Sequence, residues 1–438
     1  MKKIILAAAC AAVSGTVFAN STLNTEQRIN LLEAELQKLK VELANQKEAQ
    51  TNLQVKQEKI QQDVEKEKII TNVEKPIAPS WITWTDNVKV YGIARMDATV
   101  DFKSSPDSGG RTTSALFRTP FENDKRSNHT RSDVGMTASR LGVYFNNPSK
   151  TVTGNLEADF FDSSNMGQGD GKFRIRQAFF NYKDWTFGQT WSLMSNMETR
   201  TESVDYTQFV GTSYTRTPQM RYNWNIDANH NLKVAFEHTG SRVSAFPSLT
   251  GKYTFKDGPW LAIAQGFVNE KSVDVATDTV KKVSWGAGAG VKYQVDPKQS
   301  IQANYQHIVG DQKFMSYTSQ SGLANAGSLN AAGDFSLNEE KDDLLMNKLN
   351  SINLGYSYKF NKQWRANLSA SMFEYDSTAY SKLNPDTNKR LTDYAANVFY
   401  SPDEQMDFGV EYHQGKREVF DGRTADVSRI NFVSMYKF

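Results

Sequence analysis

Residues 87–438 alternate apolar and polar side chains with a period of two, and this pattern limits the fold more than any other feature of the sequence. In 350–360, for example, five large apolar residues alternate with serine, asparagine, glycine and lysine. A period of two belongs to β-strands whose two faces meet different surroundings. In a soluble sandwich the apolar faces meet in a core, whereas in a membrane barrel they face lipid and the polar faces line the interior.

The alternating segments predict sixteen strands. They lie at about 88–102, 139–147, 152–162, 173–182, 185–192, 217–226, 231–240, 248–256, 260–270, 283–294, 299–309, 349–360, 363–375, 391–400, 405–416 and 426–438. An even number of strands is the rule in single-chain bacterial outer-membrane barrels.

The connections between these segments alternate in length. After even-numbered strands they are short turns, such as Lys183-Asp184 and Asp257-Gly258-Pro259. After odd-numbered strands they are mostly longer, at 103–138, 193–216, 271–282, 310–348 and 376–390. Short periplasmic turns and long extracellular loops are typical of outer-membrane barrels. The sequence therefore predicts an all-β transmembrane β-barrel of about 16 antiparallel strands over 87–438, with both of its ends in the periplasm.

The C-terminal strand ends on alternate aromatic residues, Tyr436 and Phe438. A terminal aromatic that closes an alternating strand resembles the recognition signal of the outer-membrane assembly machinery. We therefore expect Tyr436 and Phe438 to serve as the assembly signal, with that machinery and the outer-membrane lipid as partners.

The first nineteen residues have the form of a secretory signal peptide. Lys2 and Lys3 precede an apolar run, and small residues at Val17 and Ala19 fit a cleavage site, so the mature chain is expected to begin at Asn20. The alternative is a lipoprotein signal at Cys10, but the apolar run before it is short. Cys10 is the one cysteine of the chain, so the mature protein holds no disulfide.

Residues 20–75 lack glycine, proline and aromatic residues and carry a heptad pattern of apolar positions. These positions are Ile29, Leu32, Leu36, Leu39, Leu43, Leu53, Ile60 and Val64. The pattern predicts an α-helical coiled coil in the periplasm, although a single charged helix or a disordered linker has a similar composition. Prolines at 76 and 79 end the helix, and 76–86 forms a linker to the barrel.

Parity along the strands assigns the side chains that line the barrel. The inward basic residues are Lys89, Arg95, Arg140, Arg174, Arg176, Arg221, Lys233, Lys252, Lys292, Lys359, Arg365 and Arg429. The inward acidic residues are Asp97, Asp101, Glu157, Asp159, Glu237, Asp393, Asp407 and Glu411. Twelve basic against eight acidic residues favour an anion-selective pore. The alternative is that these charges pair across strands and brace the wall.

The candidates for contact with solute are the basic residues of this inner face. They are Arg95, Arg140, Arg174, Arg176, Arg221, Lys252, Lys292, Lys359 and Arg365. Arginine suits the role because its planar fork binds a carboxylate or phosphate with two parallel hydrogen bonds. Whole-chain charge adds no information, because removal of Lys2 and Lys3 from 51 basic residues leaves 49 against 49 acidic ones.

The third long loop, residues 193–216, is the candidate constriction. Its acidic residues Glu198, Glu202 and Asp205 would face the basic wall if the loop folds into the barrel; the alternative is an ordinary surface loop. Glycines alternate at 286, 288 and 290, which predicts a smooth stretch of inner wall where a loop packs closely.

The sequence carries no sign of catalysis. Five histidines are scattered, and no Gly-x-Ser-x-Gly motif is present. We expect no enzyme activity, no cofactor, no metal site and no nucleic-acid partner.

Several segments together resemble one known family. They are 88–92 (VKVYG), 138–142 (ASRLG), 154–161 (GNLEADFF), 173–178 (FRIRQA), 187–192 (FGQTWS) and 218–222 (PQMRY). In this order, and after the heptad region, they resemble the DcaP-like outer-membrane porins. The resemblance implies a homotrimeric sixteen-stranded channel for small anions, notably dicarboxylates. It also implies lumen positions for Arg140, Arg174, Arg176 and Arg221.

Two other functions remain open at this stage. A phosphate-selective porin also joins a coiled coil to sixteen strands, but it lines its pore with unmixed basic ladders. Alternatively, the coiled coil binds peptidoglycan and tethers the membrane to the cell wall, with the pore secondary. The loop at 310–348 matches no segment of the family.

Overall fold

The computed structural model describes ten helical positions between 29 and 44, and residues 83–85, 87–104, 111–122, 129–161, 172–239, 246–275, 278–315, 333–376 and 378–438. The chain divides into two units, 1–76 and 77–438. The signal peptide (1–19), most of the coiled coil (20–75) and most of the linker (76–86) lie outside the described residues and stay predictions. Within that linker, Thr83–Thr85 form a short strand, β1.

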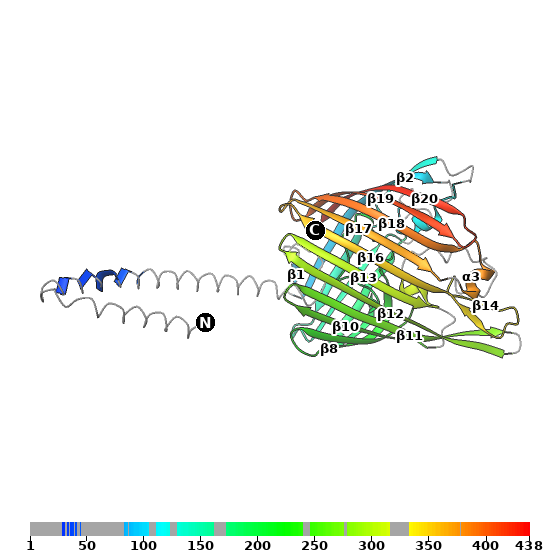
Figure 1. The fold of residues 1–438 in the computed structure, drawn as a ribbon. Helices are drawn as coiled ribbons and strands as arrows, with labels where there is room; N and C mark the ends of the chain where they lie inside the picture. Colours follow the sequence, from blue (N-terminus) through cyan, green and yellow to red (C-terminus); the bar gives the residue numbers. More distant parts are fainter. Residues whose placement is uncertain are drawn as a thin grey trace, which may run out of the picture. The chain divides into compact units, whose positions relative to one another are not determined.

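The second unit is a closed antiparallel β-barrel (Figure 1). Its strands are β2 (Val88–Ser104), β3 (His129–Gly135), β4 (Arg140–Asn146), β5 (Val152–Asp159), β6 (Arg174–Tyr182), β7 (Trp185–Trp191), β8 (Arg216–Asn225), β9 (His230–Glu237), β10 (Ser248–Asp257), β11 (Trp260–Val275), β12 (Asp278–Asp296), β13 (Gln299–Val309), β16 (Lys348–Lys359), β17 (Trp364–Tyr375), β18 (Asn388–Tyr400), β19 (Met406–Val419) and β20 (Thr424–Lys437). Pairing of β2 with β20 closes the ring.

The sheet has eighteen strands by hydrogen bonding and sixteen by wall position. β1 is a three-residue addition to the start of β2. β3 and β4 pair with different parts of the same strand, β2, so together they make one wall strand. Eighteen less β1, with β3 and β4 merged, leaves sixteen, which confirms the predicted number. The expected strand at 139–147 missed β3, which continues the same wall beyond a break at 136–139.

The expected alternation of connections is also confirmed. Two-residue turns join β6 to β7 and β10 to β11, and the outer ends carry the additional elements η1 (Thr113–Arg118), η2 (Gln312–Phe314), the hairpin β14 (Phe335–Leu337) with β15 (Leu344–Met346), and α3 (Ala379–Leu383). One expected loop is wrong: 271–282 is mostly strand, because β11 and β12 stay paired from Trp260–Tyr293 out to Val275–Asp278. Figure 1 shows α3 and β14 at the end of the barrel opposite the C-terminus.

Strand parity places the side chains as predicted. On neighbouring strands the apolar residues Leu141 and Leu156 are 52% and 53% exposed on the outer face. The charged residues Glu157 and Asp159 of the opposite parity are buried inside. Exposed apolar side chains are stable there because lipid, and not water, covers a barrel of this kind.

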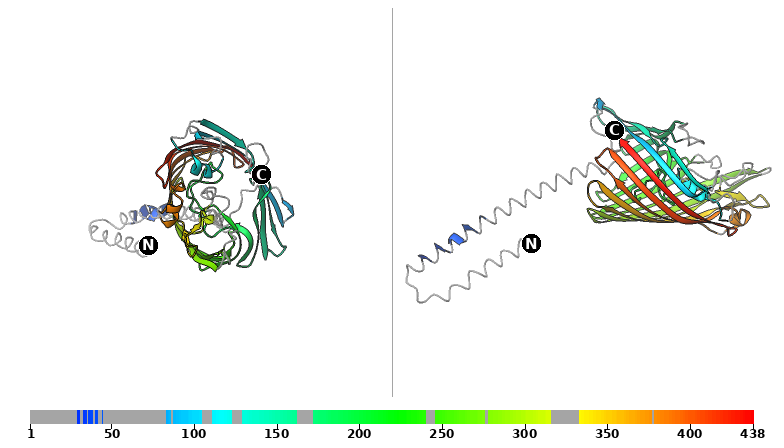
Figure 2. Two further views of the ribbon diagram at one scale, coloured as in Figure 1. Left: turned by 90° about the vertical axis from the view of Figure 1, so that its right-hand side faces the viewer. Right: turned by 90° about the horizontal axis from the view of Figure 1, so that it is seen from above.

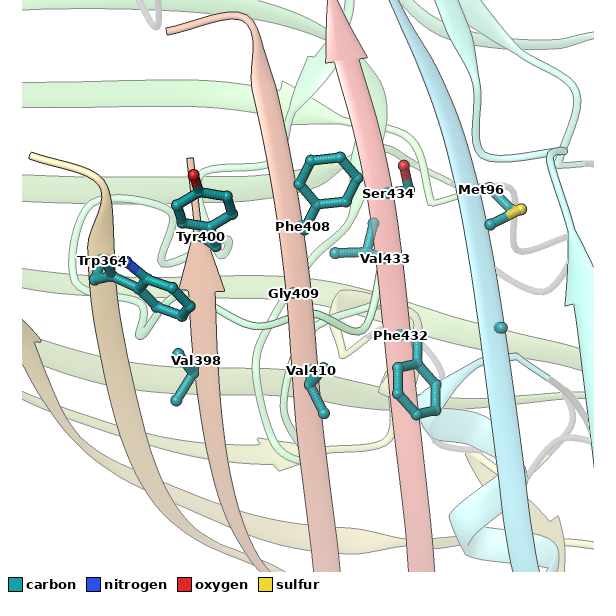
Figure 3. Close-up of a pocket in the computed structure, with 11 residues that line it drawn as sticks. Met96, Trp364, Val398, Tyr400, Phe408, Gly409, Val410, Phe432, Val433 and Ser434 are labelled. Atoms are coloured by element: carbon teal, nitrogen blue, oxygen red, sulfur yellow. The ribbon is translucent and has the colours of Figure 1, made fainter. Parts of the chain in front are cut away.

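Paired aromatic rings lie on the outer face near the short turns. Their centroids are 4.4 Å apart in Trp260–Tyr293 and 4.7 Å apart in Trp364–Tyr400. Tryptophan and tyrosine gather at membrane interfaces, where one end of the ring is apolar and the other polar. A shallow apolar groove runs across β2 and β17–β20 on the same face, between Phe408, Val410 and Phe432 (Figure 3).

The inside of the barrel is less polar than expected at the end that carries the long loops. Inward residues of six wall strands join residues of η1, η2 and the loop after β7 in one apolar cluster. Its members are Leu116, Phe117, Met194, Val210, Phe267, Ile308, Phe314, Met315, Leu349, Phe373, Tyr375, Leu391 and Val427. Parity alone predicted a polar lining throughout, but loops that fold inward need an apolar surface to pack against. Figure 2 (left) looks into this end of the barrel and shows segments within the ring.

Candidate functional site

The loop between β7 and β8, residues 192–215, lies against the inside of the barrel. Opposite parts of the wall hold it, and we call it the inner loop. Glu198 meets Lys252 of β10 at 2.7 Å, Val204 O accepts from Arg95 of β2 at 2.7 Å, and Gly211 O accepts from Ser351 of β16 at 2.7 Å. Because contacts reach strands far apart around the ring, the loop crosses the lumen and is not a surface loop.

Two wall glycines let the inner loop approach closely. A Cβ atom at Gly290 would lie 2.5 Å from Thr199 Oγ1, nearer than atoms pack. A Cβ atom at Gly355 would collide with the side chain of Thr201. The prediction that glycines of β12 make a smooth wall for a loop is therefore confirmed at Gly290, and Gly355 of β16 adds a second such place.

The three acidic residues of the inner loop differ in their surroundings. Glu198 binds Lys252, and Glu202 binds Arg365 of β17 at 2.7 Å. Burial raises the pKa of Glu198, but the ammonium group of Lys252 outweighs it and holds that pKa below the usual range. Asp205 is buried, and burial raises its pKa to about 6. Its Oδ1 accepts from the N–H and hydroxyl of Thr207 at 2.7 and 2.6 Å.

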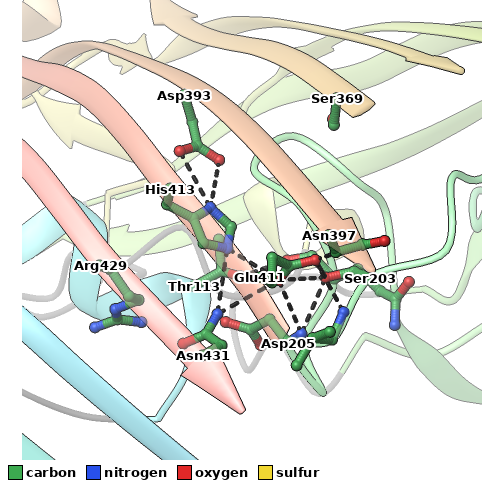
Figure 4. Close-up of polar contacts among 12 residues, drawn as sticks. Thr113, Ser203, Asp205, Ser369, Asp393, Asn397, Glu411, His413, Arg429 and Asn431 are labelled. Atoms are coloured by element: carbon green, nitrogen blue, oxygen red, sulfur yellow. Dashed lines mark hydrogen bonds and ion pairs between the residues drawn. The ribbon is translucent and has the colours of Figure 1, made fainter. Parts of the chain in front are cut away.

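A polar network on β18, β19 and β20 fastens the tip of the inner loop (Figure 4). The Glu411 carboxylate accepts hydrogen bonds from the N–H of Val204 at 2.9 Å and the N–H of Asp205 at 3.0 Å. It also accepts from the hydroxyl of Ser203 at 3.0 Å. His413 lies between Glu411 and Asp393, with 2.9 Å to each. A buried carboxylate with this many donors fixes the position of the loop.

Arg176 is a wall brace in this structure. Its side chain is fully buried and binds Glu157 at 2.5 Å and Asp159 at 2.9 Å. It has no surface to offer a solute, so its predicted role in solute contact does not fit its position. Arg174 also binds Asp159, at 2.7 Å, with 27% of its side chain exposed. Arg140 retains 26% exposure and lies 3.7 Å from Glu157.

The other predicted solute-contact residues fall into two groups. The first group forms ion pairs: Arg95 with Asp97, and Lys252 with Glu198. Arg365 also belongs to it and binds both Glu202 and Asp407. The second group, Arg221, Lys292 and Lys359, forms no ion pair with any of the described residues. Arg221 donates one hydrogen bond, to the hydroxyl of Thr186 at 3.3 Å. Lys292 interacts electrostatically with Lys359, Glu202 and Arg200.

Sequence reasoning missed a group of residues at the base of the inner loop. Arg216 lies over the ring of Trp191, with Cζ 4.5 Å from the centroid, and beside the ring of Tyr214 at 5.6 Å. Arg200 belongs to the inner loop, and strand parity assigns no direction to a loop residue. The spacing of aromatic and basic residues near 191, 200, 214 and 216 was the available signal.

The residues of the predicted assembly signal, Tyr436 and Phe438, lie at the end of the closing strand β20. The ring of Phe438 covers Gly92 of β2, where any side chain would collide with it. The backbone N–H of Phe438 donates to Gly92 O at 3.0 Å, and Gly92 N–H donates to Phe438 O at 2.8 Å. Tyr436 is 42% exposed on the outer face.

In the part of the chain that the structure describes, no group of His, Cys, Asp and Glu side chains is arranged to hold a metal ion. Among the same residues, no helix has the length and apolarity to cross a membrane.

Known proteins share this fold. The crystal structure of the outer-membrane channel DcaP of Acinetobacter baumannii superposes with a TM-score of 0.68, at 26% identity over 80% of this chain and 97% of that chain. OmpF of Salmonella typhi gives 0.54 at 12% identity over 80% and 98%. OmpT of Vibrio cholerae gives 0.51 at 14% identity over 82% and 100%. The last two likenesses show the fold alone. Among curated protein sequences, none matches.

The sequence profile described as DcaP outer membrane protein matches residues 15–438, nearly the whole chain. The match agrees with the closed sixteen-stranded barrel and with the structural likeness to an outer-membrane channel. The protein is thus an outer-membrane porin by fold and by family. On this evidence the chain belongs to the DcaP outer membrane protein family.

Proposed function

We propose that the barrel is a water-filled channel for passive uptake of small anions, dicarboxylates among them. The observation that carries this proposal is that the inward acidic residues all have partners, whereas two of the inward lysines form no ion pair with a described residue. All eight inward acidic residues are engaged: seven in ion pairs, with Arg, Lys or His413, and Glu237 in hydrogen bonds with Leu193 N–H, Thr217 and Thr250. Lys292 and Lys359, in contrast, bind no acid of the described residues.

Unpaired lysines leave the lumen with a positive potential that attracts anions. Lys359 is exposed and Lys292 half-buried, so water and solute reach both. Conduction requires sites that attract an ion and still release it. A lysine in water meets that condition, because one contact at high dielectric is worth about 1 kcal/mol.

The inner loop narrows this channel. Its contacts with strands around the ring hold backbone across the lumen, and Glu202 of the loop lies near Lys292 of the wall. Opposite charges on the two sides of a narrow passage produce a transverse field. Such a field orients solutes that carry charge at both ends.

Reversal potentials under a KCl gradient in planar bilayers test the proposal. The wild-type channel is expected to prefer chloride, and the double variant K292Q/K359Q to lose about half of that preference or more. The matched control K150Q/K298Q removes two lysines from the short turns and should change little. Cation preference in the wild type would overturn the proposal.

Succinate as the sole anion tests the substrate class. Succinate is expected to carry measurable current, and to block chloride current partially when both are present. The phosphate alternative predicts stronger block by phosphate than by succinate. Seven of the twelve inward basic residues form ion pairs, which does not support a basic ladder dedicated to phosphate.

We also propose that the protein is a homotrimer. β5 and β7 have only eight and seven residues. A tilted strand needs about 9–11 residues to cross the hydrocarbon layer. Strands this short do not cross the hydrocarbon layer fully, so this part of the barrel is stable in a membrane if other copies of the chain cover it. Mass determination by light scattering in detergent tests the trimer, and a monomeric mass would contradict it.

A further inference from the structure

Tyr214 lies near the end of the inner loop, two residues before β8. The centroid of its ring is 4.6 Å from the centroid of the Trp191 ring. The same centroid is 5.6 Å from Cζ of Arg216. Its hydroxyl accepts a hydrogen bond from Arg176 Nη2 at 3.5 Å. Only 6% of the residue is exposed, so its hydroxyl meets protein groups and little water.

Four guanidinium groups act electrostatically on this hydroxyl. Besides Arg176 and Arg216, Arg140 of β4 and Arg200 of the inner loop interact with it electrostatically. We call these four residues the arginine cluster. Such a concentration of positive charge favours an anion in its midst.

In the part of the chain that the structure describes, the acidic groups near the cluster lie on β5. Glu157 and Asp159 bind Arg176, and Glu157 also faces Arg140. The hydroxyl of Tyr206 contacts both Arg176 and Asp159. No acid of the described residues forms an ion pair with Arg200. Among the described residues, the four arginines therefore outnumber the two carboxylates that face them.

The charge on Tyr214 responds to these neighbours. Burial raises the pKa of the phenol, but the guanidinium groups of Arg176, Arg216, Arg200 and Arg140 outweigh burial and lower that pKa to about 7. An ordinary tyrosine has a pKa of about 10 and stays neutral in this range.

We propose that Tyr214 sets the anion preference of the channel by adding or withdrawing one negative charge within the arginine cluster. The inference rests on the proposed function of anion uptake and adds a residue that controls it. While the phenol is neutral, the cluster holds its full positive charge. Once the phenol ionises, the phenolate cancels part of that charge and weakens the attraction of the cluster for a solute anion. Tyr214 is buried, so it acts through the potential at the exposed face of Arg140 and does not touch the solute.

The direction of the effect follows from the chemistry of the phenol. It loses its proton as the pH rises, and each ionised Tyr214 cancels one positive charge. Preference for anions is therefore greatest below the pKa of Tyr214 and falls as the pH passes through neutrality.

Ultraviolet difference spectra of the folded protein test the ionisation itself. We expect one phenolate of the eighteen tyrosines to form between about pH 6 and 8 in the wild type. That step should be absent from Y214F and should move to higher pH in R200Q, which removes one neighbouring charge. The control Y380F should keep it, because burial raises the pKa of Tyr380 to about 12. If no phenolate forms below about pH 9, or if the step persists in Y214F, the inference is wrong.

Reversal potentials at about pH 5.5 and 8.5 test the consequence. The ratio of chloride to potassium permeability is expected to fall about two- to threefold in the wild type and to stay nearly constant in Y214F. Asp205 titrates in the same loop, so D205N is the necessary comparison; it should keep the tyrosine-dependent fall. A channel that is anion-selective at both pH values, with the same ratio in wild type and Y214F, overturns this inference and leaves the proposed function intact. A channel without anion preference at either pH overturns the proposed function instead.

Discussion

The backbone N–H of Val204 donates a hydrogen bond of 2.9 Å to the carboxylate of Glu411, and so joins the tip of the inner loop to β19. The two residues are 207 positions apart in the chain. The same carboxylate receives the N–H of Asp205 and is supported by His413. The position of the loop in the lumen therefore depends strongly on one buried carboxylate.

Replacing Glu411 with alanine is expected to release the tip of the inner loop. The change leaves two loop N–H groups without an acceptor and removes one of the two carboxylates that contact His413, at a cost of about 3–5 kcal/mol for a buried charged partner. Single-channel recordings should show larger and noisier current, and heating should unfold the barrel at lower temperature. The control E404A removes an exposed carboxylate from a turn, and it should match the wild type in both measurements.

Replacing Gly355 with valine is expected to push the inner loop away from β16. The new side chain would occupy the space that Thr201 fills. Conductance should rise if the loop moves toward the far wall, or fall if it closes the remaining passage; an unchanged value would contradict the close packing. G251A is the matched control, since its Cβ would meet a single atom, Lys233 O, at 3.9 Å.

Replacing Arg176 with alanine is expected to destabilise the barrel wall and to affect chloride and succinate currents alike. Its removal leaves Glu157 and Asp159 without their buried partner, which costs about 3–5 kcal/mol. R174A should cost less, because Arg174 is partly exposed. A selective loss of succinate current in R176A, at unchanged thermal stability, would return Arg176 to the solute pathway.

The outer loop that contains Asp334 is expected to loosen as the pH rises. Burial, and then repulsion from Asp311, raise the pKa of Asp334 to about 8. Its Oδ1 accepts a hydrogen bond from the backbone N–H of Gln312 at 2.8 Å. A carboxyl whose pKa is higher in the folded state binds a proton on folding, so its contribution is full below about pH 4 and is lost as the pH approaches 8. Hydrogen exchange in 333–347 should be faster at about pH 8.5 than at about pH 5, after correction for intrinsic rates.

The variant D334N provides the comparison for this effect. An amide does not titrate, so the corrected exchange rate in the same segment should no longer depend on pH over this range. If the dependence persists in D334N, another group is responsible for it.

Strand positions and the direction of strand side chains could be read from the sequence because both are local properties. A period of two places Leu156 outside and Glu157 inside whatever the rest of the chain does, and a short turn such as Lys183-Asp184 joins neighbours in the sheet. The register slips only at bulges, such as the one between Glu157 and Ala158 opposite β6. The barrel, its polar lumen wall and its closing strand follow from this local pattern.

The pairing of the charges could not be read in the same way. Parity correctly places Arg176 and Lys292 in the lumen, but it does not distinguish the buried brace from the lysine that binds no described acid. The difference depends on which residues the inner loop brings to each: Tyr206 contacts the buried Arg176, whereas Lys292 is half-buried and lies near Glu202. Loop residues have no fixed period, so no local pattern indicates where they point.

The amino-acid sequence by itself thus determined the number of wall strands, their two faces and the alternation of short and long connections, because hydrogen-bonded strands have a fixed geometry. The tertiary structure alone decided the path of the inner loop, the apolar cluster that includes Phe267 and Phe314 inside the barrel, and the gathering of Arg200 and Arg216 around Tyr214. These features join residues far apart in the chain, and their energies arise only when packing removes charged and apolar groups from water.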